Sequence, residues 1–313
     1  MPGFYINHLK SPRAKELAVE IEKKLAKPNV DRNLNISVYF TSYDSNDLDE
    51  ILSAGYAVIR DHPEFFYFNT DLKAAFTGTR VSLHTSSLYP LSQIESLRQS
   101  INKKIDEIVS TIPPNATPWE KERRIFEYLQ MNTKYVDDNA PERYNLVGAL
   151  LQKEAVCEGI SKAFAVLCHR VGIPCIIVFS ENHMWNIVNI NGKLSNVDAT
   201  YFTSKPHSDC DYTFFNVPDS EMIKAQHFKE INCIPPCTDT SNSFYSKMNL
   251  SFTNEREAKN YVLKSLLLKQ NPIRVKLLNG NIVRAIDSAA PFSPYGFVYS
   301  YNADAQTAII NLK

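Results

Sequence analysis

The sequence lacks the features of a membrane-spanning, nucleic-acid-binding or repeat protein. Lys plus Arg and Asp plus Glu each number 34, so the formal net charge is zero. No field of one sign is therefore present to attract nucleic acid or an anionic membrane. No apolar run reaches the roughly 18 residues that span a bilayer, and we find no internal repeat or low-complexity segment. We expect neither nucleic acid nor a membrane among the partners.

Cysteine is too sparse and too scattered for a disulfide scaffold. The 6 cysteines stand at positions 157, 168, 175, 210, 233 and 237, whereas disulfide-stapled domains are small and cysteine-dense. His207, Cys210, Cys233 and Cys237 could suggest a metal site, but their spacing matches no standard zinc pattern. We therefore expect no metal and no cofactor, and keep a zinc-dependent hydrolase as an alternative.

The N-terminal residues contain no apolar core of a signal peptide. This predicts a cytoplasmic chain if the sequence is full length, and a secreted or surface-exposed chain if a leader has been removed. The composition, 44 % hydrophobic and 22 % charged over 313 residues, is ordinary for a soluble globular protein. The length predicts about two domains, or one domain with additions.

One cysteine lies at the predicted start of an amphipathic helix. Apolar residues from Ile160 to Val171 recur at helical spacing, and Gly172 with Pro174 ends the pattern. Cys157 therefore lies at the helix N-terminus, where unpaired N–H groups and the helix dipole favour a thiolate. The same N–H groups could stabilise an oxyanion.

Cys157 could instead be an inert buried thiol, but its position at the helix start, away from the apolar face, favours a reactive role. Cys168 and Cys175 fit the inert role better, because one lies on the apolar helix face and the other in an apolar strand-like run, Ile173 to Phe179. Gly159 would let another backbone or a substrate come close to the first helical turn.

A histidine and an aspartate are predicted to meet on a β-hairpin. The strand-like runs are His183 to Ile190 and Lys193 to Thr200, separated by Asn191-Gly192. Asn-Gly is a strong signal for a two-residue turn, and this turn places Trp185 opposite Asp198. Asp198 is then the diagonal neighbour of His183 on one face of the sheet. A lone histidine or aspartate here would usually be structural, but the joint arrangement with Cys157 indicates a nucleophile, a base and its orienter.

These residues resemble the transglutaminase-like superfamily of cysteine enzymes. The matching motifs are AVCEGISKAF around Cys157, HMWNIV from His183 and NGKLSNVDATYF around Asp198. Members usually show Cys-x-Gly, His-x-Trp and Val-Asp-x-Thr in this order. The resemblance implies that Cys157 is the nucleophile, His183 the base and Asp198 the orienter. It is specific over residues 132–202 and looser on either side, where it is similar to bacterial members and implies a bacterial source.

The resemblance implies an α+β fold with a papain-like, transglutaminase-like core, in which the cysteine helix packs on an antiparallel sheet. We predict an N-terminal α+β extension at 1–112, a catalytic domain at 113–245 and a small C-terminal α/β unit at 246–313. The Ser-x-x-Glu and Thr-x-x-Glu patterns at Ser92 and Thr117 predict capping boxes at two helix starts. In the C-terminal unit, Asn279-Gly280 predicts a hairpin of Ile273–Leu278 with Ile282–Ile286, and Phe297–Tyr301 is expected to pair with Gln306–Leu312.

The function implied is acyl transfer through a thioester on Cys157, formed from a peptide or glutamine amide. If water attacks the thioester, the chain is a cysteine peptidase or amidase. The resemblance to bacterial members implies this outcome. Attack by a lysine amine makes it a protein-glutamine γ-glutamyltransferase, a crosslinking enzyme. A non-catalytic peptide-binding module on the same fold is a further alternative. The expected partner is a protein or peptide substrate, and the sequence does not indicate an oligomeric state.

Further residues are predicted to serve the site. Trp185 and Gly159 are expected to bind substrate, although Trp185 could instead belong to the core. The Cys157 N–H is one expected oxyanion donor, and Tyr135, Tyr144 and Asn145 are candidates for the second. No EF-hand-like loop is present, so the calcium dependence of animal transglutaminases does not carry over.

Overall fold

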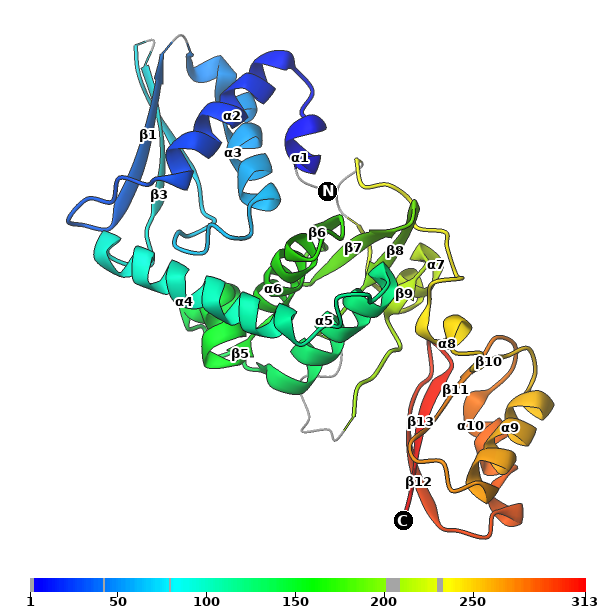
Figure 1. Cartoon of the computed structure of the whole chain (residues 1–313). Helices are drawn as coiled ribbons and strands as arrows, with labels where there is room; N and C mark the ends of the chain where they lie inside the picture. The colour runs from blue at the N-terminus through cyan, green and yellow to red at the C-terminus, as the bar shows by residue number, and fades with distance from the viewer. Residues whose placement is uncertain (1–2, 42, 79, 201–208, 230–232) are drawn as a thin grey trace.

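The structure is a computed structural model that describes residues 3–41, 43–78, 80–200, 209–229 and 233–313. It contains three sheets of three or four strands, each with helices packed beside it, and a short two-stranded pair (Figure 1). Because most strand pairs are antiparallel and helices cover the sheets, the fold is α+β, as predicted. No helix in the described part of the chain is both long and apolar enough to span a bilayer.

The N-terminal region is a three-stranded antiparallel sheet, in the order β1-β3-β2, with α2 and α3 beside it (Figure 1). Its elements are α1 (Phe4–Asn7), α2 (Pro12–Ala26), β1 (Asn35–Thr41), the 3₁₀ turn η1 (Ser45–Asp47), α3 (Leu48–Asp61), β2 (Lys73–Thr77) and β3 (Arg80–Ser86). Ser11 caps α2, since its side chain accepts a hydrogen bond from the Ala14 N–H. The apolar stripe of α2, from Ala14 to Leu25, is buried.

The central region contains the cysteine helix and its sheet. The elements are α4 (Leu91–Ser110), α5 (Pro118–Asn132), β4 (Lys134–Tyr135), the 3₁₀ helix η2 (Pro141–Tyr144), the π-helix η3 (Val147–Gln152), β5 (Glu154–Ala155), α6 (Cys157–Arg170), β6 (Cys175–Phe179), β7 (Met184–Ile190), β8 (Lys193–Val197), β9 (Phe215–Val217), α7 (Asp219–Lys224) and α8 (Phe244–Lys247). α6 lies against the antiparallel sheet β6-β7-β8-β9, as the resemblance implied (Figure 1). The Ser161 hydroxyl donates to the Met184 carbonyl at 3.0 Å, and the Asn186 amide donates to the Ser161 carbonyl at 3.1 Å. These bonds fix α6 on β7.

One of the two predicted capping boxes is present and the other is absent. At the start of α5, the Thr117 side chain accepts from the Glu120 N–H and the Glu120 side chain accepts from the Thr117 N–H. At the start of α4 the prediction is wrong: the helix begins at Leu91 after an N-cap of Pro90, and no described side chain caps it. Pro90 holds an extended backbone, so the helix begins before Ser92 could act as its cap.

A buried carboxyl group on α5 packs against the sheet. The Glu122 side chain has 0 % exposure. Its Oε2 accepts a hydrogen bond from Asn216 Nδ2 at 2.8 Å, and its Oε1 has no partner among the described residues. Burial raises the pKa of Glu122 to about 8, although the hydrogen bond from Asn216 opposes this rise. Glu122 therefore keeps its proton at neutral pH in the folded chain.

We expect Glu122→Gln to stabilise the chain at pH 8 and to have little effect at pH 5. The unfolded carboxyl ionises near 4.5, whereas the folded one ionises at about 8, so the free energy of unfolding falls as pH rises between these values. The glutamine amide resembles the protonated acid and removes this loss, raising Tm by roughly 2–4 °C for each kcal/mol. Thermal unfolding at both pH values measures this, with the exposed Glu95→Gln as control. An equal gain at pH 5 would contradict the titration.

The C-terminal unit is a four-stranded sheet, β10-β11-β13-β12, with two helices beside it (Figure 1). Its elements are β10 (Ser251–Phe252), α9 (Glu255–Leu267), β11 (Ile273–Leu277), α10 (Ile282–Asp287), the 3₁₀ turn η4 (Ala290–Phe292), β12 (Phe297–Asn302) and β13 (Thr307–Leu312). The predicted hairpin of Phe297–Tyr301 with Gln306–Leu312 is confirmed as β12 and β13. The β10–β11 pair is parallel.

The predicted hairpin across Asn279-Gly280 is wrong, because Ile282–Asp287 is the helix α10. Asn281 caps this helix by accepting a hydrogen bond from the Arg284 N–H at 3.0 Å. β10 and β13 occupy the two edges of β11, so no edge is left for a strand that follows the turn. The apolar residues of this segment are buried against α9.

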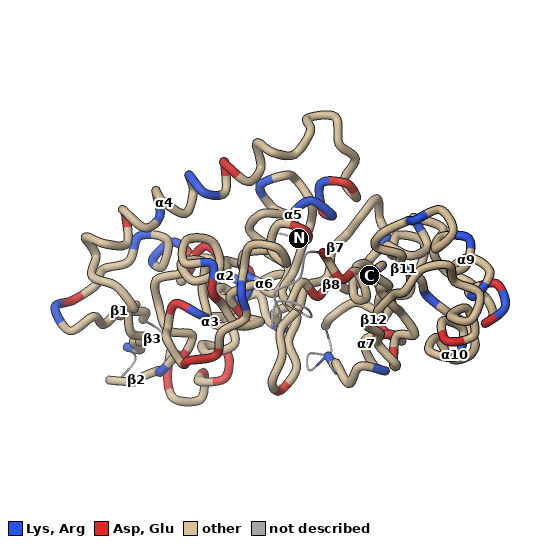
Figure 2. The backbone as a smooth tube through the Cα atoms, turned by 90° about the horizontal axis from the view of Figure 1, so that it is seen from below, with Lys and Arg blue, Asp and Glu red and all other residues tan. Residues whose placement is uncertain are grey.

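Buried apolar side chains form two clusters. One runs from Phe4 to Tyr245 and the other from Ala258 to Ile310. The first cluster continues across residue 112, because α4 packs on α6 and on η3. The domain limits at 112 and 245 therefore stay a prediction. Acidic and basic residues are interspersed over all parts of the chain (Figure 2).

Candidate active site

Cys157 is the first residue of α6 and its side chain is partly exposed. The preceding Val156 has an extended backbone, and no described side chain caps the helix start. The first-turn N–H groups and the positive end of the helix dipole therefore lie beside the sulfur. The Val156 N–H donates to the Arg143 carbonyl at 3.0 Å, which ties the start of α6 to η2.

Gly159 is required by the close approach of another backbone. A Cβ at this position would lie 2.4 Å from the Arg143 carbonyl oxygen and 3.0 Å from the Ala155 Cβ. Of the two roles considered for this glycine, the structure thus shows contact with another part of the chain. Its role in substrate binding stays a prediction.

The hairpin that carries His183 and Asp198 has the predicted register. Ile190 pairs with Lys193 and Asn186 pairs with Val197 across the two-residue turn. The turn residue Asn191 has a φ of 55° and Gly192 one of 84°, as a turn of this kind requires. His183 directly precedes β7 and Asp198 directly follows β8, so the two side chains meet at one end of the hairpin.

His183 and Asp198 form a hydrogen-bonded pair. His183 Nε2 donates to Asp198 Oδ2 at 2.8 Å. The other carboxylate oxygen, Oδ1, accepts from the Thr200 N–H at 2.8 Å. The Asp198 side chain is 1 % exposed and that of His183 is 18 % exposed. The Thr200 N–H thus holds the Asp198 carboxylate in place. The carboxylate in turn holds the His183 imidazole in the tautomer whose Nδ1 can accept a proton.

The pKa of His183 is raised and the pKa of Asp198 is lowered. Burial alone would lower the pKa of His183, but the Asp198 carboxylate and the neighbouring Cys157 raise it well above its usual range. Burial alone would raise the pKa of Asp198, but the His183 imidazolium and the Thr200 N–H lower it. The charged form of the pair is therefore favoured. Cys157, His183 and Asp198 lie in one continuous group, although their catalytic roles stay a prediction.

Trp185 supports this group from within the core. Its side chain has 0 % exposure, and its Nε1 donates to Asn196 Oδ1 at 3.0 Å. Its ring lies nearly parallel to that of His183, with centroids 6.1 Å apart. In this structure Trp185 has no exposed surface to offer a ligand, so its predicted role in substrate binding stays a prediction.

His227 is a neighbour of the site that the sequence did not reveal. Its ring centroid lies 4.5 Å from that of His183 and 5.7 Å from that of Trp185. Its Nδ1 is buried without a hydrogen-bond partner among the described residues. Burial and the nearby His183 lower the pKa of His227, although Asp198 opposes them, so a neutral ring packs against the base. His227 follows α7, and no motif links that loop to the hairpin.

The three candidates for a second oxyanion donor differ in their surroundings. Asn145 is buried, and its amide oxygen accepts from the Val147 N–H at 2.8 Å, which assigns it to the local turn. Tyr135 lies on β4, which pairs with β5 two residues before Cys157. Burial and then the nearby Cys157 raise the pKa of Tyr135, so its hydroxyl stays a donor. Burial, Asp137 and Cys157 likewise raise the pKa of Tyr144.

A metal ion could be held by side chains of the same group. Candidate ligand atoms of His183, Asp198 and His227 lie within 4.8 Å of one another. An ion there would compete with the hydrogen bond between His183 and Asp198. The late cysteines lie elsewhere: Cys210 contacts the Glu127 carbonyl and Cys237 contacts Lys229. His207, the remaining member of the alternative zinc set, lies outside the described residues.

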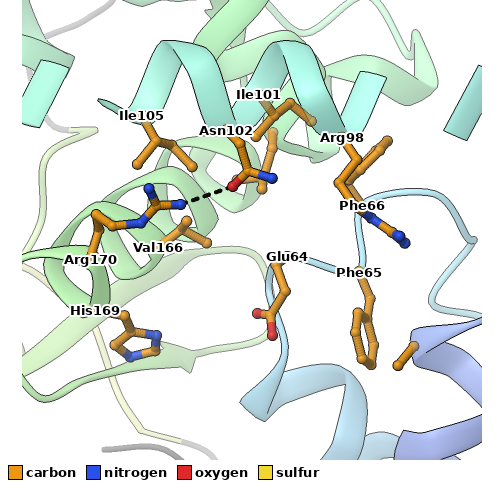
Figure 3. A pocket seen from close by; sticks show the side chains of 12 residues that line it. Glu64, Phe65, Phe66, Arg98, Ile101, Asn102, Ile105, Val166, His169 and Arg170 are labelled. Carbon is orange, nitrogen blue, oxygen red and sulfur yellow. Dashed lines mark hydrogen bonds between the residues drawn. The ribbon is translucent and has the colours of Figure 1, made fainter. Parts of the chain in front are cut away.

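The cavity of about 490 Å³ shown in Figure 3 lies away from Cys157. His169 and Arg170, at the C-terminal end of α6, line it together with Arg98 and Ile101 of α4. At 1.5 Å per residue, the length of α6 separates Arg170 from Cys157 by roughly 20 Å. We therefore do not assign this cavity to the cysteine site.

Comparisons with known proteins place the site within a recognised segment. The transglutaminase-like superfamily model matches residues 104–203, which contain Cys157, His183 and Asp198. No curated protein matches the chain.

Three solved structures are distantly similar to the chain. A "TGase" matches at 15 % identity over 56 % of this chain and 53 % of its own, with a TM-score of 0.30. A "putative cysteine protease" from Cytophaga hutchinsonii matches at 12 % identity over 42 % and 62 %, with a TM-score of 0.28. Menin matches at 14 % identity over 82 % and 52 %, with a TM-score of 0.28. This chain thus spans between half and two thirds of each of these structures.

Proposed function

We propose that the chain, whose residues 104–203 match the transglutaminase-like superfamily model, is a cysteine peptidase or amidase. Its substrate is a protein or peptide amide, which it cleaves through a thioester on Cys157. The observation that carries the proposal is the hydrogen bond of 2.8 Å between His183 Nε2 and Asp198 Oδ2, with Cys157 next to the same imidazole. A nucleophile, a base and its orienter are the parts that this chemistry needs.

The proposed reaction has two halves. In the first, the Cys157 thiol proton passes to His183 Nδ1 and the sulfur attacks the amide carbonyl carbon. The tetrahedral intermediate expels the amine, which takes the proton from His183, and a thioester remains. In the second, His183 takes a proton from water, the hydroxide attacks the thioester, and the acid leaves as the thiol regains its proton. Asp198 stays ionised and stabilises the imidazolium throughout.

The partial exposure of the site supports hydrolysis over crosslinking. The His183 side chain keeps 18 % of its surface exposed, and Cys157 is also accessible. Water therefore reaches the position from which a thioester would be attacked. A crosslinking enzyme must favour an amine over water, which is present at a far higher concentration.

Ammonia release from glutamine peptides distinguishes the two outcomes. We expect ammonia or peptide cleavage at a rate that an added primary amine leaves unchanged, with no amine incorporated into the product. Mass spectrometry of the product measures the incorporation. Stoichiometric incorporation of the amine would overturn the hydrolase assignment in favour of the crosslinking enzyme, while leaving the thioester mechanism in place.

Two further alternatives are separated by simple tests. A non-catalytic peptide-binding module would bind peptides without releasing product, yet this chain retains all three residues of the predicted triad. A zinc-dependent hydrolase would lose activity with a chelator and keep it after alkylation of the thiol. We expect the reverse, because no step of the proposed reaction uses a metal.

Tyr135→Phe is expected to lower kcat by about 100- to 1,000-fold with little change in KM. Of the three candidates we propose Tyr135 as the second oxyanion donor, because β4 pairs with β5 two residues before Cys157 and the nearby Cys157 helps to raise the pKa of Tyr135. The oxyanion forms after binding, and loss of one such donor costs roughly this much. Steady-state kinetics with a peptide or amide substrate measures both constants. Tyr295→Phe, on a tyrosine 37 % exposed in the C-terminal unit, is the matched control. A change in KM alone would assign Tyr135 to substrate binding.

A further inference from the structure

A smaller cavity borders the cysteine site on the side of the N-terminal region. Its volume is about 180 Å³, well above the roughly 10–15 Å³ that one water molecule needs. Its apolar lining comes from Tyr56, Ile59, Ile177, Phe179 and Met184. These residues come from α3 of the N-terminal region and from β6 and β7 of the core. The cavity thus lies where the two regions meet.

Two lining residues are chain neighbours of the reacting residues. Glu158, which lines it, follows Cys157 at the start of α6, and Met184, which also lines it, follows His183 at the start of β7. The cavity therefore lies beside the end of α6 that carries Cys157. The cavity of Figure 3 has no such connection.

The walls of the cavity are held in place before any ligand binds. The Tyr5 hydroxyl donates to the Ile177 carbonyl, which ties the N-terminal region to β6. The Arg60 guanidinium, also in the lining, lies 4.5 Å from the centre of the Phe179 ring. Gly55 on α3 lets Leu72 approach, since a Cβ there would lie 2.6 Å from its Cδ1. The Tyr5 and Arg60 contacts therefore hold the N-terminal region against β6, whereas the Gly55 contact holds α3 within its own region.

The charged residues of the lining are already paired or packed. Lys162 Nζ donates to Glu158 Oε1 at 2.6 Å and to the Tyr144 carbonyl at 3.0 Å. The Arg60 side chain packs on aromatic rings, and burial is the main cause that lowers its pKa. A ligand in the cavity thus meets mostly aliphatic and aromatic surface, which favours an apolar group over a charged one.

We propose that this cavity is a specificity pocket for a bulky apolar side chain, of the leucine or phenylalanine class, on the peptide substrate. The side chain belongs to a residue adjacent to the amide that Cys157 attacks. This inference rests on the proposed function and narrows its substrate to peptides with such a residue. It gives the N-terminal region a role, since α3 supplies Tyr56, Ile59 and Arg60.

Peptide-like electrophiles that alkylate Cys157 test the pocket without relying on turnover. Two peptidyl vinyl sulfones are compared. The benzyl probe has a phenylalanine side chain next to the electrophile, and the glycine probe has only hydrogen there. Iodoacetamide is the reference for thiol reactivity. Intact-mass spectrometry gives the rates. We expect the benzyl probe to react roughly 10- to 100-fold faster than the glycine probe, the range by which apolar pockets discriminate.

Opposite changes at Ile59 give the decisive comparison. Ile59→Trp fills the pocket and is expected to remove the preference for the benzyl probe, with the iodoacetamide rate unchanged. Ile59→Ala enlarges the pocket and is expected to shift the preference toward a naphthylmethyl side chain. Leu48→Trp, on the same helix but 38 % exposed, is the matched control and keeps the preference. Circular dichroism melts verify that each variant folds. If Ile59→Trp does not fold, the result for Ile59→Ala tests the pocket on its own.

The outcomes separate this inference from the proposed function. Equal rates for the benzyl and glycine probes, with Cys157 reactive toward iodoacetamide, would overturn the pocket and leave the cysteine mechanism intact. The pocket would likewise be overturned if Ile59→Trp kept the same preference for the benzyl probe as Leu48→Trp. A Cys157 that reacts with none of the three reagents would overturn the proposed function, and this inference with it.

Discussion

We expect Cys157→Ala to abolish turnover and to leave the fold unchanged. The substitution removes the atom that forms the thioester, and loss of a nucleophile of this type lowers kcat by at least about 10⁴-fold. The side chain is only partly buried at a helix start, so the shorter alanine costs little stability and is a good helix former. Activity on a peptide or amide substrate and a thermal melt together measure both parts of the prediction.

Cys233→Ala is the matched control for this experiment. Cys233 is another partly exposed cysteine, outside the predicted triad, so the same substitution there should leave the activity unchanged. Full activity in Cys157→Ala would contradict the mechanism. Loss of activity together with a collapsed melting transition would be a folding effect, and Cys157→Ser would then be used to restore packing without restoring the thiol.

Asp198→Asn is expected to lower kcat severely, by up to about 10⁴-fold, with residual turnover. The carboxylate accepts from His183 Nε2 at 2.8 Å and so fixes the tautomer in which Nδ1 receives the thiol proton. An asparagine amide can donate to the imidazole and thereby favour the wrong tautomer. Because asparagine has nearly the same shape, the backbone contacts of this position should survive.

The pH profile of kcat/KM distinguishes an orienting role of Asp198 from a purely structural role. The Asp198 carboxylate raises the pKa of His183, so its removal lowers that pKa and makes the imidazolium lose its proton at lower pH. The alkaline limb of the kcat/KM profile should therefore move to lower pH in Asp198→Asn. Asp287→Asn, in the C-terminal unit, removes the same charge and should leave the profile unchanged. An unshifted alkaline limb in Asp198→Asn would assign Asp198 to stability alone.

Local signals in the sequence were sufficient for the hairpin and the cysteine helix. The Asn-Gly turn fixes the register of β7 and β8, so the contact between His183 and Asp198 follows from counting residues along two strands. Gly172 and Pro174 mark the end of α6 in the same local way. These features depend on neighbours in the sequence, and they were predicted correctly.

Features that depend on contacts between distant segments were not predicted. His227 reaches His183 from a loop after α7, and Ile59 reaches the pocket beside Met184 from the N-terminal region. The Ile282–Asp287 segment shows how the whole sheet can override a local turn signal, since both edges of its expected partner were already occupied. From the sequence, Trp185 could either contact substrate or belong to the core. In the structure its side chain is buried in the core.

Alkylation by iodoacetamide across pH, with mass spectrometry to locate the modified cysteine, tests the central claim most directly. The account predicts rapid labelling of Cys157 at neutral pH and its loss in His183→Ala. The buried cysteines should react more slowly, because burial raises the pKa of Cys210 and of Cys237 to about 12. Slow labelling spread over several cysteines, unaffected by His183→Ala, would contradict an assembled pair of thiol and imidazole.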